Sequence, residues 1–379
     1  MPTVNTIAGH ILTPQGFVRG TVACGPDGRI TRVEGTPIAD ERSTRDSHLP
    51  IVLPGFIDLH VHGGGGRDIM EGGDAAAHVA RAHAAHGTTS LLATTMTAPV
   101  EDLETAFKGL AQLCSQRRSQ SAQVLGVHLE GPYINAGKLG AQPGYARPVS
   151  LDELGRLNAI APVRLVTLAP EVAGNMESIQ ALTHSGFRVQ IGHTLGTYED
   201  AIEAMARGAR GFTHLFNAMT PLHHRMPGMV GAALAHAQHA EIIPDLLHVH
   251  PGAIKVALRS IPGLYCVTDS TSATGMPDGD YMLGRQRVTK CLGGVRLADG
   301  TLAGSTLTMD KALRNLVDKL GLGLADASDR VSTHAANYLG LGDRGRLQAG
   351  AWADLVVINR ELQLQAVYAQ GERIEGARA

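Results

Sequence analysis

The chain has 379 residues, of which 44% are hydrophobic and 18% are charged. This length is ordinary for a barrel of ~250 residues with an attached domain, and the low charge content argues against disorder and against a coiled coil. The formal net charge of −2 offers no basic excess for general binding to nucleic acid or to an anionic membrane surface. No apolar run approaches the ~20 residues of a membrane span.

The N-terminus and the cysteines bear on the cellular compartment. The first residues contain no basic segment followed by an apolar one, so no secretory signal is predicted. The four cysteines lie far apart and form no CxxC pair, which is typical of reduced thiols rather than of disulfides or a zinc framework. We therefore expect a cytoplasmic protein.

Two β-rich segments frame the chain. The first runs from about residue 6 to 49, and the second begins at about residue 345; both read as short strands broken by glycine and polar turns. Each offers too few strands to be stable alone. We expect the ends to form one small β-sandwich domain from residues 1–52 and 345–379, around a central domain at 53–344.

In the central region, strand-like runs alternate with helix-like segments. Eight strand candidates lie at residues 54–62, 88–95, 123–130, 163–170, 187–194, 211–217, 241–249 and 264–269. Helix candidates lie at residues 74–87, 101–119, 150–157, 175–186, 197–208, 230–240 and 251–260. This alternation predicts an α/β fold, a closed (β/α)8 TIM-like barrel, because right-handed crossovers can curl a parallel sheet shut. An open, doubly wound sheet is the alternative.

The ends of the predicted strands carry a set of ionisable residues. In a (β/α)8 barrel the active site forms at the C-terminal ends of the strands. The residues at those ends are His60, His62, Glu130, His193, His214 and Asp269. Each has an ordinary interpretation alone: a chance HxH pair, a core histidine, a salt bridge or a helix cap. Their convergence on one rim predicts a metal site, since His60 and His62 at i and i+2 point to the same face of a strand.

Imidazole and carboxylate ligands suit a hydrolytic metal site. One or two divalent ions per subunit are expected, zinc first, with iron, manganese or cobalt as alternatives. A metal held this way keeps positions open for water and substrate, and lowers the pKa of bound water towards ~7. Asp269 can take the proton of that water and pass it to a leaving nitrogen. The residues alone thus predict hydrolysis of an amide or ester, without indicating which.

Several motifs extend the interpretation to a known family. They lie at residues 53–66, 86–90, 128–135, 138–143, 192–209, 213–234, 267–281 and 302–309, and they include HLEGP, THLFNAM and GMPDG. In these motifs the chain resembles the amidohydrolase superfamily and, within it, the family of N-acetylglucosamine-6-phosphate deacetylases. The resemblance implies removal of the acetyl group from N-acetyl-D-glucosamine 6-phosphate, which gives D-glucosamine 6-phosphate and acetate.

The resemblance also implies roles for the rim residues. Glu130, His193 and His214 would hold the principal metal, and Asp269 would be the general base and acid. Many superfamily members bridge two metals with a carboxylated lysine, whereas the acidic ligand here is Glu130, which favours the deacetylase branch. Some deacetylases lack the HxH pair and use one metal. This chain keeps His60 and His62, which allows a second ion.

The substrate contacts of the family carry over by motif. They fall on Ala141, Gln142, Asn217, Ala218, His224, Arg225, His248, Leu302, Ala303 and Gly304. Arg225 resembles the arginine that reaches the 6-phosphate across a dimer interface, with His224 beside it, and a planar guanidinium suits bidentate phosphate binding. The expected partners are thus a small amino-sugar phosphate and a second copy of the chain.

Two positions depart from the family pattern. Some relatives have a histidine at Gln142 that helps to polarise the acetyl carbonyl; glutamine can donate a hydrogen bond but carries no charge. Leu246 stands where relatives often have glycine, which changes how closely the backbone can approach a ligand. The galactosamine epimer therefore stays open as the substrate. A cyclic amide and a catalytically inactive scaffold are further alternatives, although the motifs favour a sugar phosphate and no expected ligand is missing.

Other histidines and a glycine run have structural interpretations. His83 with His86, and His236 with His239, stand three residues apart on predicted helices, without a carboxylate or cysteine nearby in the sequence. We expect none of them to bind metal. The run of four glycines at 63–66 could cradle a phosphate, but a close-packed turn beside the metal site is the favoured interpretation.

Overall fold

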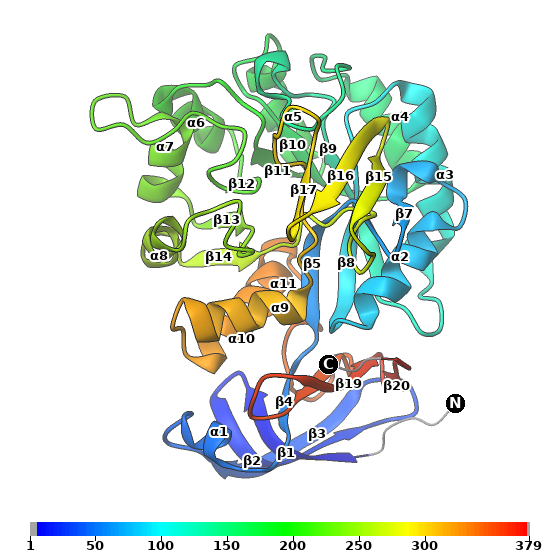
Figure 1. Ribbon diagram of the computed structural model, residues 1–379, viewed down its shortest axis with the longest axis vertical. Coiled ribbons are helices and arrows are strands. Elements are labelled where there is room, and N and C mark those ends of the chain that lie inside the picture. Colours follow the sequence, from blue (N-terminus) through cyan, green and yellow to red (C-terminus); the bar gives the residue numbers. More distant parts are fainter. Residues whose placement is uncertain (1–5, 377–379) are drawn as a thin grey trace.

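The computed structural model describes residues 6–376 and has two parts (Figure 1). A barrel surrounded by helices forms the larger part, and a sheet to which both chain ends contribute lies below it in the view. Within residues 6–376, no helix combines the length and the apolar character needed to cross a bilayer.

The smaller part is a seven-stranded sheet in the order β20-β19-β18-β4-β1-β2-β3. Its strands are β1 (Thr6–Thr13), β2 (Gly16–Cys24), β3 (Ile30–Pro37), β4 (Ile51–Pro54), β18 (Leu355–Ile358), β19 (Leu364–Ala369) and β20 (Glu372–Arg373). The sheet folds over, because the amide of Ile30 at the start of β3 donates to the carbonyl of Ala351 just before β18. The central strand β4 ends two residues beyond the predicted boundary at residue 52.

Eight parallel strands build the barrel. They are β5 (Phe56–Val61), β8 (Thr88–Thr95), β9 (Gln123–Glu130), β10 (Val163–Leu168), β11 (Arg188–Ile191), β12 (Gly211–Phe212), β13 (His239–Ile242) and β14 (Gly263–Cys266). Every residue of β5 and β8 is buried, as expected for strands covered on both faces. Two bonds close the ring: the Leu215 amide donates to the Glu241 carbonyl over 2.9 Å, and the Asp269 amide to the His60 carbonyl over 3.0 Å. The predicted closed barrel is confirmed.

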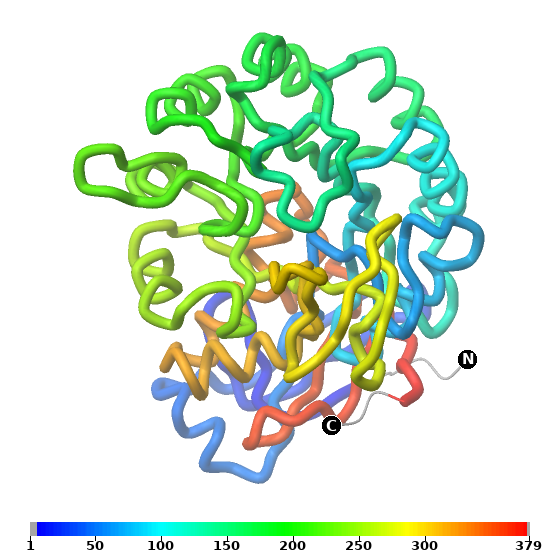
Figure 2. The backbone as a smooth tube through the Cα atoms, turned by 45° about the horizontal axis from the view of Figure 1, so that its top comes forward, coloured from blue at the N-terminus to red at the C-terminus, as the bar shows by residue number. Residues whose placement is uncertain are grey.

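Helices surround this barrel (Figure 2). They are α2 (Ala75–Ala84), α3 (Val100–Ser115), α4 (Leu151–Ile160), α5 (Asn175–His184), α6 (Tyr198–Ala206), α7 (Gly228–His236), α8 (Pro251–Ser260), α9 (Met309–Arg314), α10 (Leu324–Val331) and α11 (Thr333–Leu339). Local chemistry fixes their ends: Thr197 and Asp200 form a capping box before α6, and Gly208 follows it at φ 115°. The first seven match predicted helices, whereas the helices after residue 308 have no counterpart in the prediction.

The later barrel strands are shorter than predicted. Those predicted at 211–217, 241–249 and 264–269 end at residues 212, 242 and 266. The backbone adopts left-handed φ values of 29° at His214, 67° at Leu246 and 50° at Asp269, which an extended strand cannot contain. Periodicity could not reveal this, because apolar residues continue beyond the strand ends.

Short elements complete the fold. They are α1 (Ser43–Asp46), β6 (Gly63–Gly64), β7 (Arg67–Asp68), η1 (Ile69–Glu71), η2 (Ala136–Lys138) and η3 (Asn315–Lys319). An antiparallel sheet, absent from the prediction, follows the eighth barrel strand: β15 (Gly279–Leu283), β16 (Gln286–Cys291) and β17 (Gly294–Arg296). It is the yellow sheet in Figure 1 and has a small core of its own, which includes Met96, Val288 and Ala303.

Candidate active site

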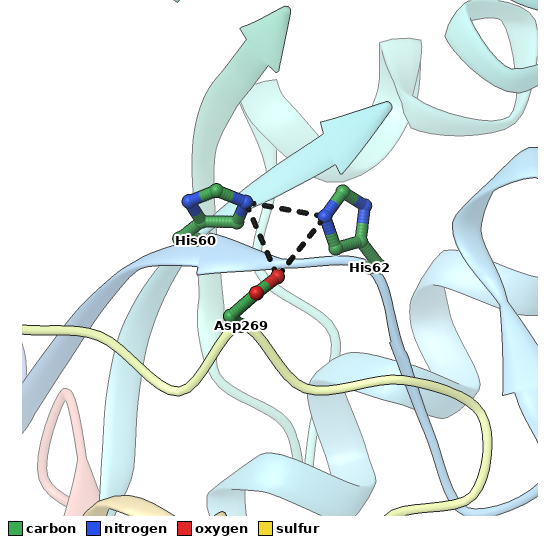
Figure 3. Close-up of side chains that lie close together, drawn as sticks. All are labelled: His60, His62 and Asp269. Atoms are coloured by element: carbon green, nitrogen blue, oxygen red, sulfur yellow. Dashed lines mark hydrogen bonds and ion pairs between the residues drawn. The ribbon is translucent and has the colours of Figure 1, made fainter. Parts of the chain in front are cut away.

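The six ionisable rim residues converge at the C-terminal ends of the barrel strands. His60 lies in β5 and His62 just beyond it, Glu130 ends β9, His193 and His214 lie two residues past β11 and β12, and Asp269 follows β14. All six are buried. Figure 3 shows His60, His62 and Asp269 pointing toward one another, the two histidines from β5 and Asp269 from the segment after β14. The predicted spatial cluster is therefore present.

Three of these residues have a strained backbone. His193, His214 and Asp269 have φ values of 49°, 29° and 50°, in the left-handed region that non-glycine residues seldom adopt. Such conformations cost about 1–3 kcal/mol each and gather at functional sites, where surrounding structure holds them. Here the turn of the chain directs each side chain into the mouth of the barrel.

One group of donor atoms contains Glu130, His193 and His214. The Glu130 Oε1 atom lies 3.1 Å from His193 Nε2 and 3.0 Å from His214 Nε2, and the two imidazole nitrogens are 3.1 Å apart. Ligands of a tetrahedral metal at bond lengths of ~2.0–2.1 Å stand about 3.3 Å from one another. The three atoms therefore fit a single divalent ion.

A second group lies on the other side of the same carboxylate. His60 Nε2 and His62 Nε2 are 3.1 Å apart, and Asp269 Oδ1 lies 3.4 and 3.3 Å from them. The second oxygen of Glu130, Oε2, is 3.2 Å from His62 Nε2. Glu130 thus faces both groups, and Asp269 can contact an ion held by His60 and His62 as well as a water molecule.

The buried charges stabilise one another. Burial alone would raise the pKa of the Glu130 carboxyl, but the imidazoles around it, His60 foremost, hold that pKa well below its usual range. Burial opposes ionisation of Asp269 too, yet His60 and His62 lower its pKa to about 2. Against the effect of burial, Asp269 and Glu130 raise the pKa of His62 to about 9. The donor set thus favours positive charge at its centre, which a divalent cation supplies while displacing imidazole protons.

Further residues that the sequence analysis missed hold the imidazoles in place. Glu241 Oε2 lies 2.9 Å from His60 Nδ1 and accepts from the His214 amide over 3.1 Å. The Lys138 carbonyl lies 2.8 Å from His193 Nδ1. His128 packs its ring against that of His60, with centroids 4.6 Å apart. Carboxylate and carbonyl partners of this kind orient metal-binding imidazoles. The one feature of the sequence that could have indicated Glu241 is its place at the start of an apolar run.

Gln142 contacts the shared carboxylate directly. Its Nε2 donates to Glu130 Oε2 over 2.6 Å, and its Oε1 accepts from the Thr97 amide over 2.6 Å. The side chain is thus fixed at both ends. In this structure its amide group acts on Glu130, while its position on the wall of the cavity keeps it beside the substrate space.

A cavity of about 390 Å³ opens over the donor groups. The predicted substrate residues in its wall are Ala141, Gln142, Asn217, Ala218, His248, Leu302 and Gly304. His248 is oriented by Asp245, whose Oδ2 lies 2.6 Å from Nδ1. Leu283 of β15 also lines the cavity, so the unpredicted sheet forms part of the site. Ala303, between two lining residues, instead packs in the small core of that sheet.

The two residues predicted to bind phosphate lie elsewhere. His224 and Arg225 are exposed on the loop between β12 and α7, which projects from the left of the body in Figure 2, and neither lines the cavity. Arg225 Nη1 lies 2.8 Å from His224 Nε2. The protomer does not bring these side chains to its own metal-binding residues.

His83 and His236, which lie on helices, have structural partners. His83 Nε2 lies 3.0 Å from the Gly63 carbonyl, and burial lowers the pKa of His83 to about 4. His236 Nε2 lies 2.6 Å from the Tyr198 hydroxyl. Neither belongs to any metal-competent group found between residues 6 and 376. A Cβ atom at Gly63 would stand 2.5 Å from the Ser272 amide nitrogen, so this part of the glycine run is close-packed.

A closed parallel barrel, with histidines and carboxylates converging at the carboxyl ends of its strands, defines the class of metal-dependent barrel hydrolases. Residues 51–374 match the model of the amidohydrolase family, and the chain belongs to that family.

Several similar proteins are deacetylases of amino-sugar phosphates. An N-acetylgalactosamine-6-phosphate deacetylase of Escherichia coli O157:H7 is 39% identical over 96% of this chain and 97% of its own length. An N-acetylglucosamine-6-phosphate deacetylase of Lysinibacillus sphaericus is 37% identical over 91% of each chain. A variant of the N-acetyl-D-glucosamine-6-phosphate deacetylase of Mycobacterium smegmatis, solved in complex with N-acetyl-D-glucosamine 6-phosphate, matches with a TM-score of 0.89 and 33% identity over 98% of this chain and 100% of its own.

Proposed function

We propose that this protein hydrolyses the acetamido group of N-acetyl-D-glucosamine 6-phosphate and yields D-glucosamine 6-phosphate and acetate in the cytoplasm. The observation that carries the proposal is the pair of donor groups that share Glu130 beneath a cavity of about 390 Å³, with Asp269 at its floor. The similarity to deacetylases over nearly the whole chain supports the same reaction.

The donor groups would hold one or two divalent ions, zinc first. Glu130, His193 and His214 would bind the principal ion, and His60 with His62 the second. A bound divalent ion supplies a water of lowered pKa and polarises the acetyl carbonyl. Buried imidazole and carboxylate donors, already held by Glu241 and the Lys138 carbonyl, suit this task.

The protein's own groups would move the protons. Asp269, with a pKa of about 2, is ionised at neutral pH and can accept a proton from the attacking water. The water oxygen bonds to the acetyl carbon, Asp269 returns the proton to the amide nitrogen, and the carbon–nitrogen bond breaks. Gln142 and His248, both in the cavity wall, would orient the sugar and its acetyl group.

The phosphate of the substrate would be held by a neighbouring subunit. Lys138 is the one lysine or arginine that the described residues place in the cavity wall, and Arg225 is exposed on a projecting loop. With a net charge near zero, a phosphate dianion needs a local cation. We assign this role to Arg225, with His224 beside it, in the active site of the partner of a homodimer.

The galactosamine epimer is the second candidate substrate. The E. coli relative is named for it, and Leu246 occupies a left-handed position at φ 67°, a conformation that glycine adopts at no steric cost. Steady-state kinetics on both N-acetylhexosamine 6-phosphates, with metal content measured on the same sample, tests the assignment. A higher kcat/KM for the glucosamine epimer is expected. Turnover of neither compound by metal-loaded protein would overturn the proposed reaction.

Subunit mixing tests the shared site. Arg225→Ala should weaken binding of the phosphorylated sugar by roughly 2–4 kcal/mol. Mixing Arg225→Ala chains with Asp269→Asn chains should restore activity, because a mixed dimer has one site that lacks both groups and one intact site. Exchange is verified by mass. No recovery after verified exchange would show that Arg225 does not act across an interface.

A further inference from the structure

A second cavity lies at the opposite end of the barrel from the metal-binding residues. Its volume is about 520 Å³, larger than the cavity over the donor groups. Arg188 begins β11, Arg210 directly precedes β12 and His239 begins β13, and all three line it. Because the strands are parallel, their amino ends share one rim, and residues of α11 complete the wall.

Two guanidinium groups face this cavity without a counter-charge. Among residues 6–376, neither the Arg188 nor the Arg210 side chain forms an ion pair or hydrogen bond. The residues lining the cavity include no aspartate or glutamate. By contrast Arg207, three residues before Arg210 in the chain, is paired with Glu203 at 2.7 Å and lies outside the lining. The cavity therefore concentrates positive charge.

Of the two histidines that line the cavity, His239 has a pKa that responds to this charge. Burial lowers the pKa of His239 first, and the charges of His334, Arg188 and Arg210 lower it further. Its ring packs on Tyr338 with centroids 5.2 Å apart. Asn337 and Gln238 add amide groups to the lining. The walls thus combine cations with hydrogen-bonding groups.

We propose that this cavity is a binding site for a small phosphorylated metabolite, distinct from the active site. Two guanidiniums suit the oxygens of a phosphate dianion, which they can bind bidentately. A volume of about 520 Å³ exceeds the need of a bare phosphate and leaves room for an organic group beside the amides of Gln238 and Asn337. Buried side chains, including Gln190 and Tyr265 joined over 2.6 Å, separate it from the metal-binding residues.

Calorimetric titration of the full-length, metal-loaded protein tests the proposal. The probes are inorganic phosphate and glucose 6-phosphate, with glucose as the uncharged control. All proteins carry Arg225→Ala, so that the phosphate contact of the proposed active site is removed. Arg188→Gln combined with Arg210→Gln should lower the affinity of the second site for both phosphates at least tenfold and remove about one binding site per chain. Each single variant should show a smaller loss.

A charge-matched control separates the cavity from the general field of the protein. Arg207→Gln with Arg259→Gln also removes two arginines, one half-buried and one exposed, and neither of them lines the cavity. This control should bind both phosphates like the parent, and unfolding temperatures without ligand verify that all variants are folded. Equal binding by the cavity variant and the parent would overturn the site, as would an equal loss in the control. If the cavity variant lost affinity for inorganic phosphate but not for glucose 6-phosphate, the proposal that the cavity also accommodates an organic group would be wrong.

Discussion

The carboxyl and amino ends of the barrel handle charge in different ways. At the carboxyl end, Glu130 and Asp269 are buried, and both oxygens of Glu130 and the Oδ1 atom of Asp269 have an imidazole nitrogen within 3.5 Å. At the amino end, Arg188 is half-buried, Arg210 is exposed, and neither has a partner in the described chain. Buried charges must be paired, and pairing fixes their geometry. Arg188 and Arg210, which have no such partner, can instead pair with an anionic ligand.

Removal of a ligand of the principal metal should have the largest effect. His193→Asn leaves two protein ligands where three converge, so we expect about one metal ion per chain to be lost and turnover to be abolished. Elemental analysis of the purified variant measures this loss. His184→Asn, on the exposed end of α5, is the matched control. Normal metal content in His193→Asn would contradict its role as a ligand.

Asp269→Asn should come next. The amide keeps the shape of the side chain but cannot accept a proton, so kcat should fall ~10²–10⁴-fold while substrate binding is largely retained. Single-turnover kinetics with bound substrate separates the two effects. Asp152→Asn, exposed in the first turn of α4, should behave like the parent. A kcat within a factor of a few of the parent value would exclude Asp269 as the proton-transfer group.

Glu241→Gln probes a residue that supports the metal site without lining the cavity. The neutral amide would hold His60 and the His214 amide less firmly, so metal affinity or activity should fall ~10–100-fold. Competition with a chelator measures the affinity, and restoration of activity at high metal concentration would distinguish weakened metal binding from misfolding. Glu203→Gln, the same substitution on an exposed helix, is the control. Unaltered metal affinity in Glu241→Gln would remove Glu241 from the site.

A charge exposed to water should matter least. Arg207→Gln breaks an exposed pair with Glu203 one turn away on α6, and such pairs contribute about 0.3–0.5 kcal/mol. Urea denaturation should show a change in the free energy of unfolding of this size. A decrease of several kcal/mol in the free energy of unfolding would mean that water does not screen this ion pair.

Much of the site could be predicted from the sequence, because its residues stand at the ends of recognisable strands and are of types that bind metal. The two histidines of the HxH pair point to the same face of their strand, because side chains alternate along a strand. Glu130 stands at the end of a strand that the sequence also predicts. Other features depended on contacts between distant segments. Glu241 meets His60 across 181 positions of sequence, and the role of Gln142 depends on its bond to Glu130. Neither contact is encoded in local pattern.

The amino-end cavity shows the same limit. Arg188 begins one strand and Arg210 directly precedes the next, and both look like ordinary surface residues in sequence. Only the parallel arrangement, with α11 packed beneath, makes them share a wall. The helices after residue 308 were missed for a related reason, because they follow the inserted sheet β15–β17, which interrupts the alternation of strands and helices.

The central place of β4 in the small sheet has a consequence for synthesis of the chain. β4 pairs with β1 on one side and with β18 on the other, about 300 residues later in sequence. At ~5–20 residues per second, a ribosome needs roughly 15–60 s to make the stretch between them. Throughout that interval the nascent β4 presents an unpaired edge of hydrophobic residues. Chaperones cover such a surface, and an uncovered one promotes aggregation.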